Sequence, residues 1–418
     1  MIRQTDTYAN FRSSILSKFN IDLDQVSIPD GYKPALYAFL ASRVVVFFVA
    51  YFSEIMIVTG RENNPEFYHI AKDNVFLDVL ARWDSGFYIT IVDGGYEMIT
   101  GQISNIAFFP LYPLLISFTN IFFDNTLLSG IIVSHVAFFF ALVYLYRLTL
   151  LVTDDNGTAQ RTIYYLSVFP TAFFFSAVYT ESLFLCLSVA AIYYAKIKKW
   201  EIATIFTLLV GVTRITGILV FGVVGLEWLA SHGWTISTCY KKEAWVNLWE
   251  GIKEDWFNLS LLLLAPLGFF SHMMFLNNQF QDPIAFWSVQ SAFNRQADGP
   301  VAIFLRDFGP LLSQNFWIGD IWWNVLFDSI AIIFALGAAP FVYKRFGEGM
   351  ALFIVLSVLV PLASGTGSMT RYILVLFPLF MMLGIWGTRP SVDRFFQTFF
   401  PTFMGLLTAV FVNWVFVA

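Results

Sequence analysis

Long apolar runs separated by short polar stretches make up most of this chain. The run over residues 34–59 is long enough to cross about 30 Å of hydrocarbon as a helix, and similar runs recur to the C-terminus. If each run is a helix, the sequence predicts eleven membrane spans, near residues 34–59, 127–150, 162–179, 182–195, 202–213, 216–230, 257–277, 321–343, 350–364, 372–387 and 397–417. We therefore predict an all-α polytopic membrane protein.

Lysine and arginine residues predict the orientation of these spans, because they favour the cytoplasmic side of short loops. The basic loops are residues 147–161, 196–199, 241–253, 344–345 and 389–394. When all of them face the cytoplasm, the N-terminus is also inside. The loops 60–105, 277–320 and 364–370 are then extracytoplasmic.

Two apolar segments have more than one interpretation. The run 108–123 contains Pro110 and Pro113 and could be a twelfth span, but counting it would invert every later loop against the charge bias. We interpret it as a re-entrant or interfacial segment. The run 201–230 would exceed about 40 Å as one helix, so we predict two short helices that meet at Arg214.

Composition supports the membrane class and excludes others. The chain is 58% hydrophobic and 13% charged, with a mean hydropathy of +0.68. A net charge of −5 without a basic face argues against a nucleic-acid partner. Cys186 and Cys239 lie in an apolar run and a polar loop, so neither a disulfide framework nor a cysteine metal site is expected. No cleavable signal peptide and no linker is apparent, and we expect one membrane domain over residues 1–418.

Acidic residues and arginines gather on the predicted extracytoplasmic face. The first loop there holds a polar cluster, Arg82-Trp83-Asp84, and the other candidates follow along the chain as Asp93, Tyr96, Glu181, Arg214, Asp282, Arg295, Arg306 and Arg371. Ionisable groups near a bilayer are costly to desolvate and usually have a partner or a function. A carboxylate can act as a general base towards a hydroxyl group, and arginine binds phosphate through two parallel hydrogen bonds. These groups suit the transfer of a sugar from a lipid phosphate.

Structural interpretations compete for several of these residues. Arg371 begins an apolar run and could simply extend its guanidinium to lipid headgroups. Glu181 could cap the helix that follows it, and Asp93, before Gly94-Gly95, could serve only a turn. His135 stands alone in an apolar run, so an internally hydrogen-bonded histidine is expected rather than a metal ligand.

Motifs in chain order resemble the PIG-V family of glycosylphosphatidylinositol mannosyltransferases and their prokaryotic relatives. The specific part is the pair of segments 82–88 (RWDSGFY) and 108–113 (FFPLYP), joined by 91–96 (IVDGGY). The stretches 169–184 and 213–217 (TRITG) resemble further motifs of that family. The resemblance extends over about residues 35–390.

The resemblance implies a GT-C glycosyltransferase fold of about eleven helices, with a polyprenyl- or dolichyl-phosphate mannose donor and inversion at the anomeric carbon. It implies Asp84 as catalytic base. Arg82, Trp83, Asp93, Tyr96, Glu181, Arg214 and Arg371 are the expected substrate-binding residues. No cofactor and no metal is expected, because arginines can supply the positive charge. The acceptor would be a glycan or glycolipid hydroxyl. The enzyme would lie in the cell membrane of a prokaryote or the endoplasmic reticulum membrane of a eukaryote, with its active site extracytoplasmic.

The chain departs from the family pattern at two positions. Phe87 stands where eukaryotic members carry His, and Thr216 stands where they carry Asn. These departures leave the identity of the acceptor open, and it need not be a glycosylphosphatidylinositol intermediate. The alternatives are a secondary transporter or flippase of lipid-linked sugars, which would also keep charges and broken helices in the membrane, and a non-catalytic scaffold subunit, which would leave the Trp83-Asp84 cluster without a role.

Overall fold

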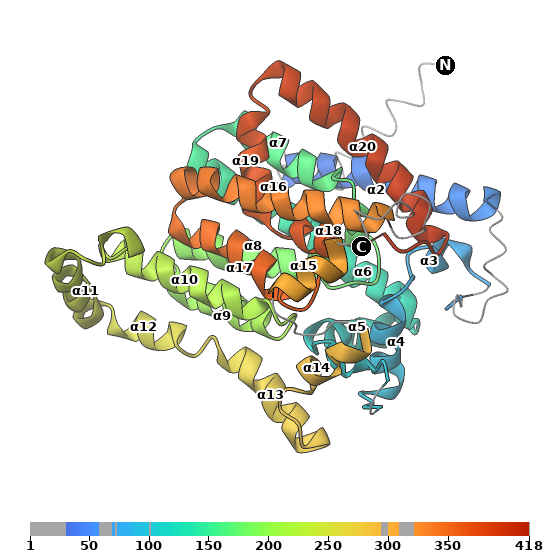
Figure 1. The fold of residues 1–418 in the computed structure, drawn as a ribbon, viewed down its shortest axis with the longest axis horizontal. Helices are drawn as coiled ribbons and strands as arrows, with labels where there is room; N and C mark the ends of the chain where they lie inside the picture. Colours follow the sequence, from blue (N-terminus) through green and yellow to red (C-terminus); the bar gives the residue numbers. More distant parts are fainter. Residues whose placement is uncertain are drawn as a thin grey trace, which may run out of the picture.

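The computed structural model describes residues 31–57, 69–71, 73–99, 102–293, 300–308 and 322–417. Helices form every regular element in this part of the chain (Figure 1). They are α2 (Tyr32–Met56), α3 (Val75–Asp78), α4 (Ser85–Gly94), η2 (Asn105–Ala107), α5 (Leu111–Phe123), α6 (Thr126–Thr153), α7 (Asn156–Ser167), η3 (Ala172–Phe175), α8 (Glu181–Lys196), α9 (Trp200–Gly211), α10 (Gly217–Ser231), η4 (Ile236–Thr238), α11 (Lys242–Glu254), α12 (Trp256–Leu262), α13 (Leu267–Phe280), α14 (Ala285–Ser288), η5 (Val289–Phe293), α15 (Pro300–Phe308), α16 (Trp322–Phe346), α17 (Glu348–Leu362), α18 (Met369–Leu374), α19 (Phe377–Trp386) and α20 (Pro390–Val412).

Five helical segments in the described residues are long and apolar enough to cross a membrane. They are α2, α6, the α12–α13 segment, α16 and α20. The shorter apolar helices α5, α9, α10, α17 and α19 lie between them in sequence. The protein is thus an all-helical integral membrane protein, as the hydrophobic pattern predicts.

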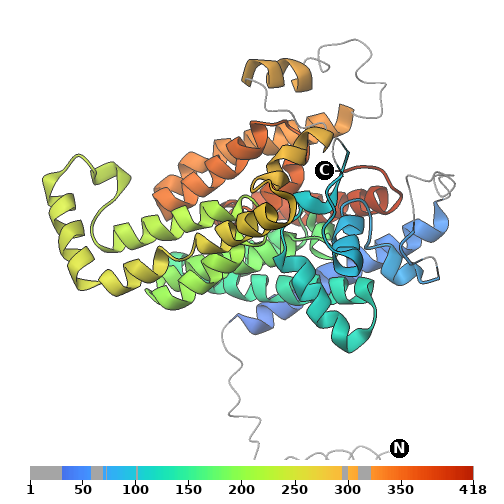
Figure 2. The ribbon, with the colours of Figure 1, turned by 90° about the horizontal axis from the view of Figure 1, so that it is seen from below.

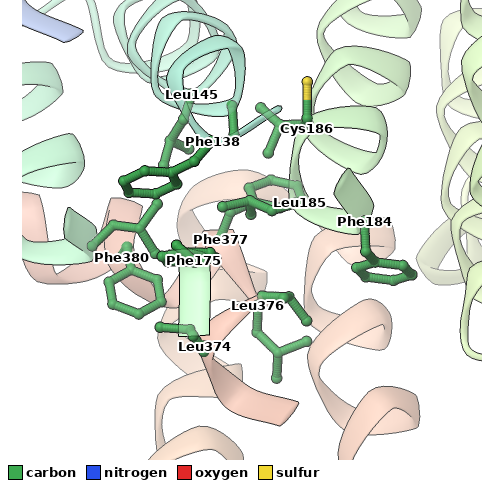
Figure 3. Close-up of a cluster of buried hydrophobic side chains, with 14 of the residues drawn as sticks. Phe138, Leu145, Phe175, Phe184, Leu185, Cys186, Leu374, Leu376, Phe377 and Phe380 are labelled. Atoms are coloured by element: carbon green, nitrogen blue, oxygen red, sulfur yellow. The ribbon is translucent and has the colours of Figure 1, made fainter. Parts of the chain in front are cut away.

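The core lies where α6, α8 and the segment around α18 and α19 meet (Figure 3). The rings of Phe138 and Phe175 stack there at 4.4 Å. Phe377 and Phe380 are fully buried in the same cluster. Close packing of large aromatic side chains makes this region the rigid support for the segments that leave it.

The two ends of the helix bundle carry different parts of the sequence. In both views α11 lies across one end, whereas α3 and α4 lie at the opposite end (Figures 1 and 2). The basic segment 241–253 and the first motif are therefore far apart, as the charge-based topology requires.

The structure confirms the break predicted within residues 201–230. The helix α9 ends at Gly211, α10 begins at Gly217, and Arg214 lies between them. The segment 108–123 forms α5, whose 13 residues reach only about 20 Å. The interfacial interpretation stays a prediction, because α9, which corresponds to a predicted span, is one residue shorter than α5.

Three predicted spans differ from the structure. The segment 162–179 is not one helix, because α7 ends at Ser167 and Pro170 follows in an irregular, buried stretch. Within residues 372–387, α18 ends at Leu374 and α19 begins at Phe377, with Pro378 in its first turn. The predicted span 257–277 is confirmed as a segment long and apolar enough to cross, Trp256–Phe280, although Pro266 marks a break between α12 and α13. The predicted span 397–417 ends early, since α20 stops at Val412 and the remaining described residues form a non-helical tail.

Cysteine labelling tests the predicted topology. Glu97 and Lys198 are exposed positions in loops that we expect on opposite sides of the membrane. In a Cys239→Ser background, which removes the exposed native thiol, Glu97→Cys should react with an impermeant maleimide added outside intact cells. Lys198→Cys should react only after permeabilisation. Equal labelling of the two from outside would contradict the eleven-span topology.

Candidate active site

A cavity of about 730 Å³ lies beside the start of α4. Polar and charged side chains line one part of the cavity, and most of the other lining residues are aromatic. The walls come from segments far apart in sequence: the start of α4, the start of α8, the α9–α10 break, α18 and the tail after α20. The ionisable residues among those lining it are Asp84, Tyr88, Glu181, Arg214, Arg371 and Tyr372.

An unbroken chain of ion pairs crosses the polar wall. Arg371 Nη1 donates to Asp84 Oδ2 at 2.6 Å. Arg371 Nε lies 3.6 Å from Glu181 Oε1, and Arg214 Nη1 donates to the same oxygen at 2.8 Å. Two carboxylates thus neutralise two guanidinium groups beside an open cavity.

The four ion-paired side chains differ in how far they are buried. Glu181 is 1% and Arg371 7% exposed, whereas the side chains of Asp84 and Arg214 are 24% and 15% exposed. Burial tends to lower the pKa of Arg371, but the carboxylates of Asp84 and Glu181 outweigh it and raise that pKa well above the usual value. Arg371 is therefore a permanent cation, placed between the two acids.

Local structure explains the position of Asp84. It is the residue before the first turn of α4, and Trp83 before it adopts a left-handed conformation with φ 54°. The Tyr179 hydroxyl spans this bend, accepting from the Asp84 N–H at 3.2 Å and donating to the Arg82 carbonyl at 3.1 Å. The bend turns the Asp84 carboxylate towards Arg371.

The other charged residues lie at helix ends. Glu181 is the first residue of α8, and Arg214 lies in the break before α10. Arg371 lies on the six-residue helix α18, whose first turn is fixed by Asp328 of α16. The Asp328 carboxylate accepts from the Thr370 N–H at 2.7 Å and from the Thr370 hydroxyl at 2.6 Å.

Tyr179→Phe tests the importance of the bend at Trp83. The variant loses both hydrogen bonds of the hydroxyl, so we expect the unfolding free energy to fall by about 1 kcal/mol. Turnover should fall by roughly tenfold, because small misplacements of a reacting group are costly. Tyr144→Phe, which removes a hydroxyl that lies 3.4 Å from the Tyr194 hydroxyl, is the matched control. Equal effects of the two changes on turnover would contradict a positioning role.

Arg82 does not line the cavity. It is fully buried, donates from Nε to the Val412 carbonyl at 2.8 Å, and pairs with Asp78 at 2.6 Å and Glu54 at 3.2 Å. Asp78 also pairs with His69 Nδ1 at 2.6 Å. Burial opposes ionisation of Asp78, but Arg82 and hydrogen bonds from Ala71 and His69 hold its pKa below the usual value. The guanidinium of Arg82 is thus engaged by protein groups behind Asp84.

Asp93 and Tyr96 also lie outside the residues that line the cavity. Asp93, in the last turn of α4, accepts from the Thr126 hydroxyl at 2.8 Å. The Tyr96 hydroxyl donates to the Phe108 carbonyl at 2.9 Å. Both residues connect neighbouring segments through these hydrogen bonds.

The remaining candidates have varied positions. Asp282 accepts from the Ile284 N–H at 3.0 Å in a turn, Arg306 pairs with Asp307 at 2.7 Å, and Arg295 lies outside the described residues. His135 makes the expected internal contact, from Nδ1 to the Ile131 carbonyl at 2.8 Å. Within the part of the chain that the structure describes, no three His, Cys, Asp or Glu side chains come together as a metal site would require.

Comparison with known proteins bears on this geometry. Residues 42–242 match the family model described as mannosyltransferase (PIG-V). The match covers 201 of the 418 residues, just under half of the chain, and it agrees with the resemblance that the motifs carry. The matched residues include Asp84, Glu181 and Arg214, three of the four members of the ion-pair chain. No curated protein sequence matches the chain.

Solved structures give weaker likenesses. The oligosaccharyltransferase of Archaeoglobus fulgidus in the apo form is similar over 90% of this chain and 55% of its own, with 12% identity and a TM-score of 0.43. AglB from Archaeoglobus fulgidus, in complex with an inhibitory peptide and a dolichol-phosphate, is similar over 89% and 54%, with 13% identity and a TM-score of 0.36. The chain spans about half the length of each.

The sequence did not indicate every residue at the candidate site. Asp328 lies within the apolar run of α16, where an acidic residue is itself a signal of a buried partner. Trp414 and Phe416 line the cavity but fall in a run that reads as a membrane span. They face the cavity rather than lipid because α20 ends at Val412 and the chain turns back after it.

Proposed function

We propose that this protein transfers mannose from a polyprenyl- or dolichyl-phosphate donor to a hydroxyl of a glycan or glycolipid, on the extracytoplasmic side of the membrane. The proposal includes a GT-C type architecture and inversion at the anomeric carbon. One observation carries it. The carboxylate of Asp84 and the guanidinium groups of Arg371 and Arg214 line one cavity, and together they supply a base and a phosphate site.

The proposed donor site is the pair of arginines. A guanidinium presents a planar set of N–H donors that matches phosphate oxygens. Arg214 is partly exposed to the cavity, and Arg371 is adjacent through Glu181. A lipid phosphate at this position would leave its hydrocarbon chain against the aromatic part of the wall, which includes Phe87, Phe108 and Phe293.

Asp84 acts as the base. Its carboxylate removes the proton of the acceptor hydroxyl while that oxygen forms a bond to the anomeric carbon. The bond from the same carbon to the phosphate oxygen breaks, and its electron pair leaves with the lipid phosphate. Arg371 and Arg214 stabilise the charge that develops on this leaving group. The reaction needs no metal ion, since the positive charge comes from side chains.

The pair between Asp84 and Arg371 has a role in this scheme. Arg371 Nη1 donates to Asp84 Oδ2 at 2.6 Å, so this oxygen already accepts a hydrogen bond. A donor phosphate offers Arg371 a second anion, so the guanidinium can shift part of its hydrogen bonding to the phosphate. Asp84 then becomes a better acceptor for the hydroxyl proton when the donor is present.

The competing proposal is a transporter or flippase of lipid-linked sugars. Transporters usually bind substrates near the middle of the membrane, between pseudo-symmetric halves. Here the ion-pair chain includes Asp84, the residue before α4, and α4 lies at one end of the helix bundle (Figure 1). That position favours transfer at the membrane surface.

A donor comparison tests the proposal. Purified protein in vesicles receives polyprenyl-phosphate mannose or a nucleotide-linked mannose, with an extract of membrane lipids and glycans as acceptors. We expect a mannosylated product only from the lipid-phosphate donor, and the rate should persist in the presence of a chelator. Movement of the intact donor across the vesicle membrane without product would instead support the flippase.

A further inference from the structure

The tail after α20 forms part of the cavity wall next to Asp84. The helix ends at Val412, and the next residues turn back so that Trp414 and Phe416 line the cavity together with Trp83. The ring of Trp83 meets the rings of Trp414 at 5.7 Å and Phe416 at 5.3 Å, both edge to face. These three aromatic residues form a cluster that we call the tryptophan wall.

The backbone of the tryptophan wall is unusual. Trp83 and Trp414 both adopt left-handed conformations, with φ 54° and 60°. Bulky residues rarely adopt such angles, and they persist where the surroundings fix them, often at functional sites. Trp83 and Trp414 share this conformation, contact each other and line the same cavity. We infer that the backbone fixes the orientation of both indole rings.

Buried polar groups hold the tryptophan wall from behind. The Arg82 guanidinium lies 4.9 Å from the ring centre of Trp414 and donates to the Val412 carbonyl. Asn413 Nδ2 donates to the Ser53 hydroxyl at 2.7 Å. These contacts fix the tail to α2 and to the first motif, so the wall is preformed. They also give Arg82 a positioning role.

The location of the wall relative to Asp84 limits what can bind there. A base must lie within hydrogen-bond reach of the hydroxyl that it deprotonates, so the molecule carrying that hydroxyl must pack beside Asp84. Trp83 precedes Asp84 directly, and Trp414 and Phe416 extend the same surface. The phosphate-binding arginines and the cluster of Phe87, Phe108 and Phe293 are separate from it, with no ring contact between the two aromatic groups in the described residues.

We propose that the tryptophan wall is the acceptor subsite and that its ligand is a sugar ring. A pyranose has a face of C–H groups that packs on an indole ring, while its hydroxyl groups point outwards at the ring edge. That shape would place one hydroxyl at Asp84 and the ring against Trp83 and Phe416, while Trp414, which is 7% exposed, contributes one edge of the surface and holds the other two rings in place. A lipid alcohol or a peptide hydroxyl would need no fixed pair of rings. This inference rests on the proposed function for the identity of the base.

Four variants test the subsite. Trp414→Leu and Phe416→Leu remove aromatic rings but keep apolar volume, and Trp414→Phe keeps a smaller ring. Phe395→Leu, at an exposed ring near the other end of α20, is the matched control. If Trp414→Leu does not fold, Phe416→Leu still tests the subsite. Phe416 is 40% exposed, so its replacement should leave the fold intact.

The first readout is transfer from polyprenyl-phosphate mannose to methyl α-mannopyranoside or to octanol. We expect Trp414→Leu and Phe416→Leu to raise the KM for the pyranoside about three- to tenfold, with Trp414→Phe in between. The KM for the donor and the rate with octanol should not change. Equal losses with both acceptors, or a higher donor KM, would overturn the sugar-ring assignment.

The second readout does not depend on turnover. Saturation-transfer NMR should show magnetisation passing from the wild-type protein to the ring C–H protons of methyl α-mannopyranoside. The signal should persist in Phe395→Leu and disappear in Trp414→Leu. Persistence in Trp414→Leu and Phe416→Leu would overturn the inference. If the signal behaves as expected but no lipid-phosphate donor gives product, the proposed function fails and the sugar site stands.

Discussion

Replacing Asp84 by Asn should reduce mannose transfer by about a hundredfold to ten-thousandfold, the usual contribution of a general base. Asn has nearly the same shape as Asp and can still accept from Arg371, but it cannot take a proton. The loss should appear in kcat. Binding of the lipid-phosphate donor should remain, because the arginines that hold the phosphate are unchanged.

Two controls separate chemistry from folding in this experiment. Asp93→Asn changes a carboxylate outside the cavity that bonds to Thr126, and it should cost far less activity. Thermal unfolding of each purified variant shows whether the fold survives. Turnover near the wild-type rate in Asp84→Asn would remove Asp84 as the base, and an equal loss in Asp93→Asn would remove the distinction between the two acids.

Replacing Arg371 or Arg214 by Lys should weaken use of the donor by roughly ten- to hundredfold. Hydrogen bonds to charged groups contribute about 1.5–3 kcal/mol, and an ammonium group cannot reproduce the paired geometry of a guanidinium. The effect should be larger for Arg371, because it contacts both Asp84 and Glu181. The measurement is the apparent KM for polyprenyl-phosphate mannose beside that for the acceptor.

A distant arginine supplies the control for this series. Arg161 pairs with Asp155 at 3.4 Å, with both side chains partly exposed, and Arg161→Lys should leave the donor KM unchanged. If both Arg371→Lys and Arg214→Lys keep the wild-type donor KM, the two arginines serve the ion-pair chain and do not bind the phosphate.

Much of the fold follows from the hydrophobic pattern of the sequence. Runs long enough to span a bilayer became helices at α2, α6 and α16. The charge of Arg214 in the middle of an apolar run predicted the break between α9 and α10. Local signals of this kind are reliable because the membrane allows few ways to satisfy the backbone.

Pairing between distant segments could not be predicted in this way. Glu181 has no basic residue near it in sequence, yet Arg214 and Arg371 both reach it across the fold. Arg82 is next to the first motif but faces away from the cavity because Asp78, Glu54 and the Val412 carbonyl engage it. The tail after α20 was also missed, because residues 397–417 are mostly apolar and Asn413, the C-cap of α20, is the one polar residue near the helix end.

The most direct measurement is a structure of the Asp84→Asn protein in lipid with polyprenyl-phosphate mannose bound. We predict phosphate oxygens within hydrogen-bond distance of Arg371 and Arg214, and the anomeric carbon facing the side chain at position 84. A donor bound with its phosphate away from both arginines, or with its sugar outside the cavity, would contradict the account.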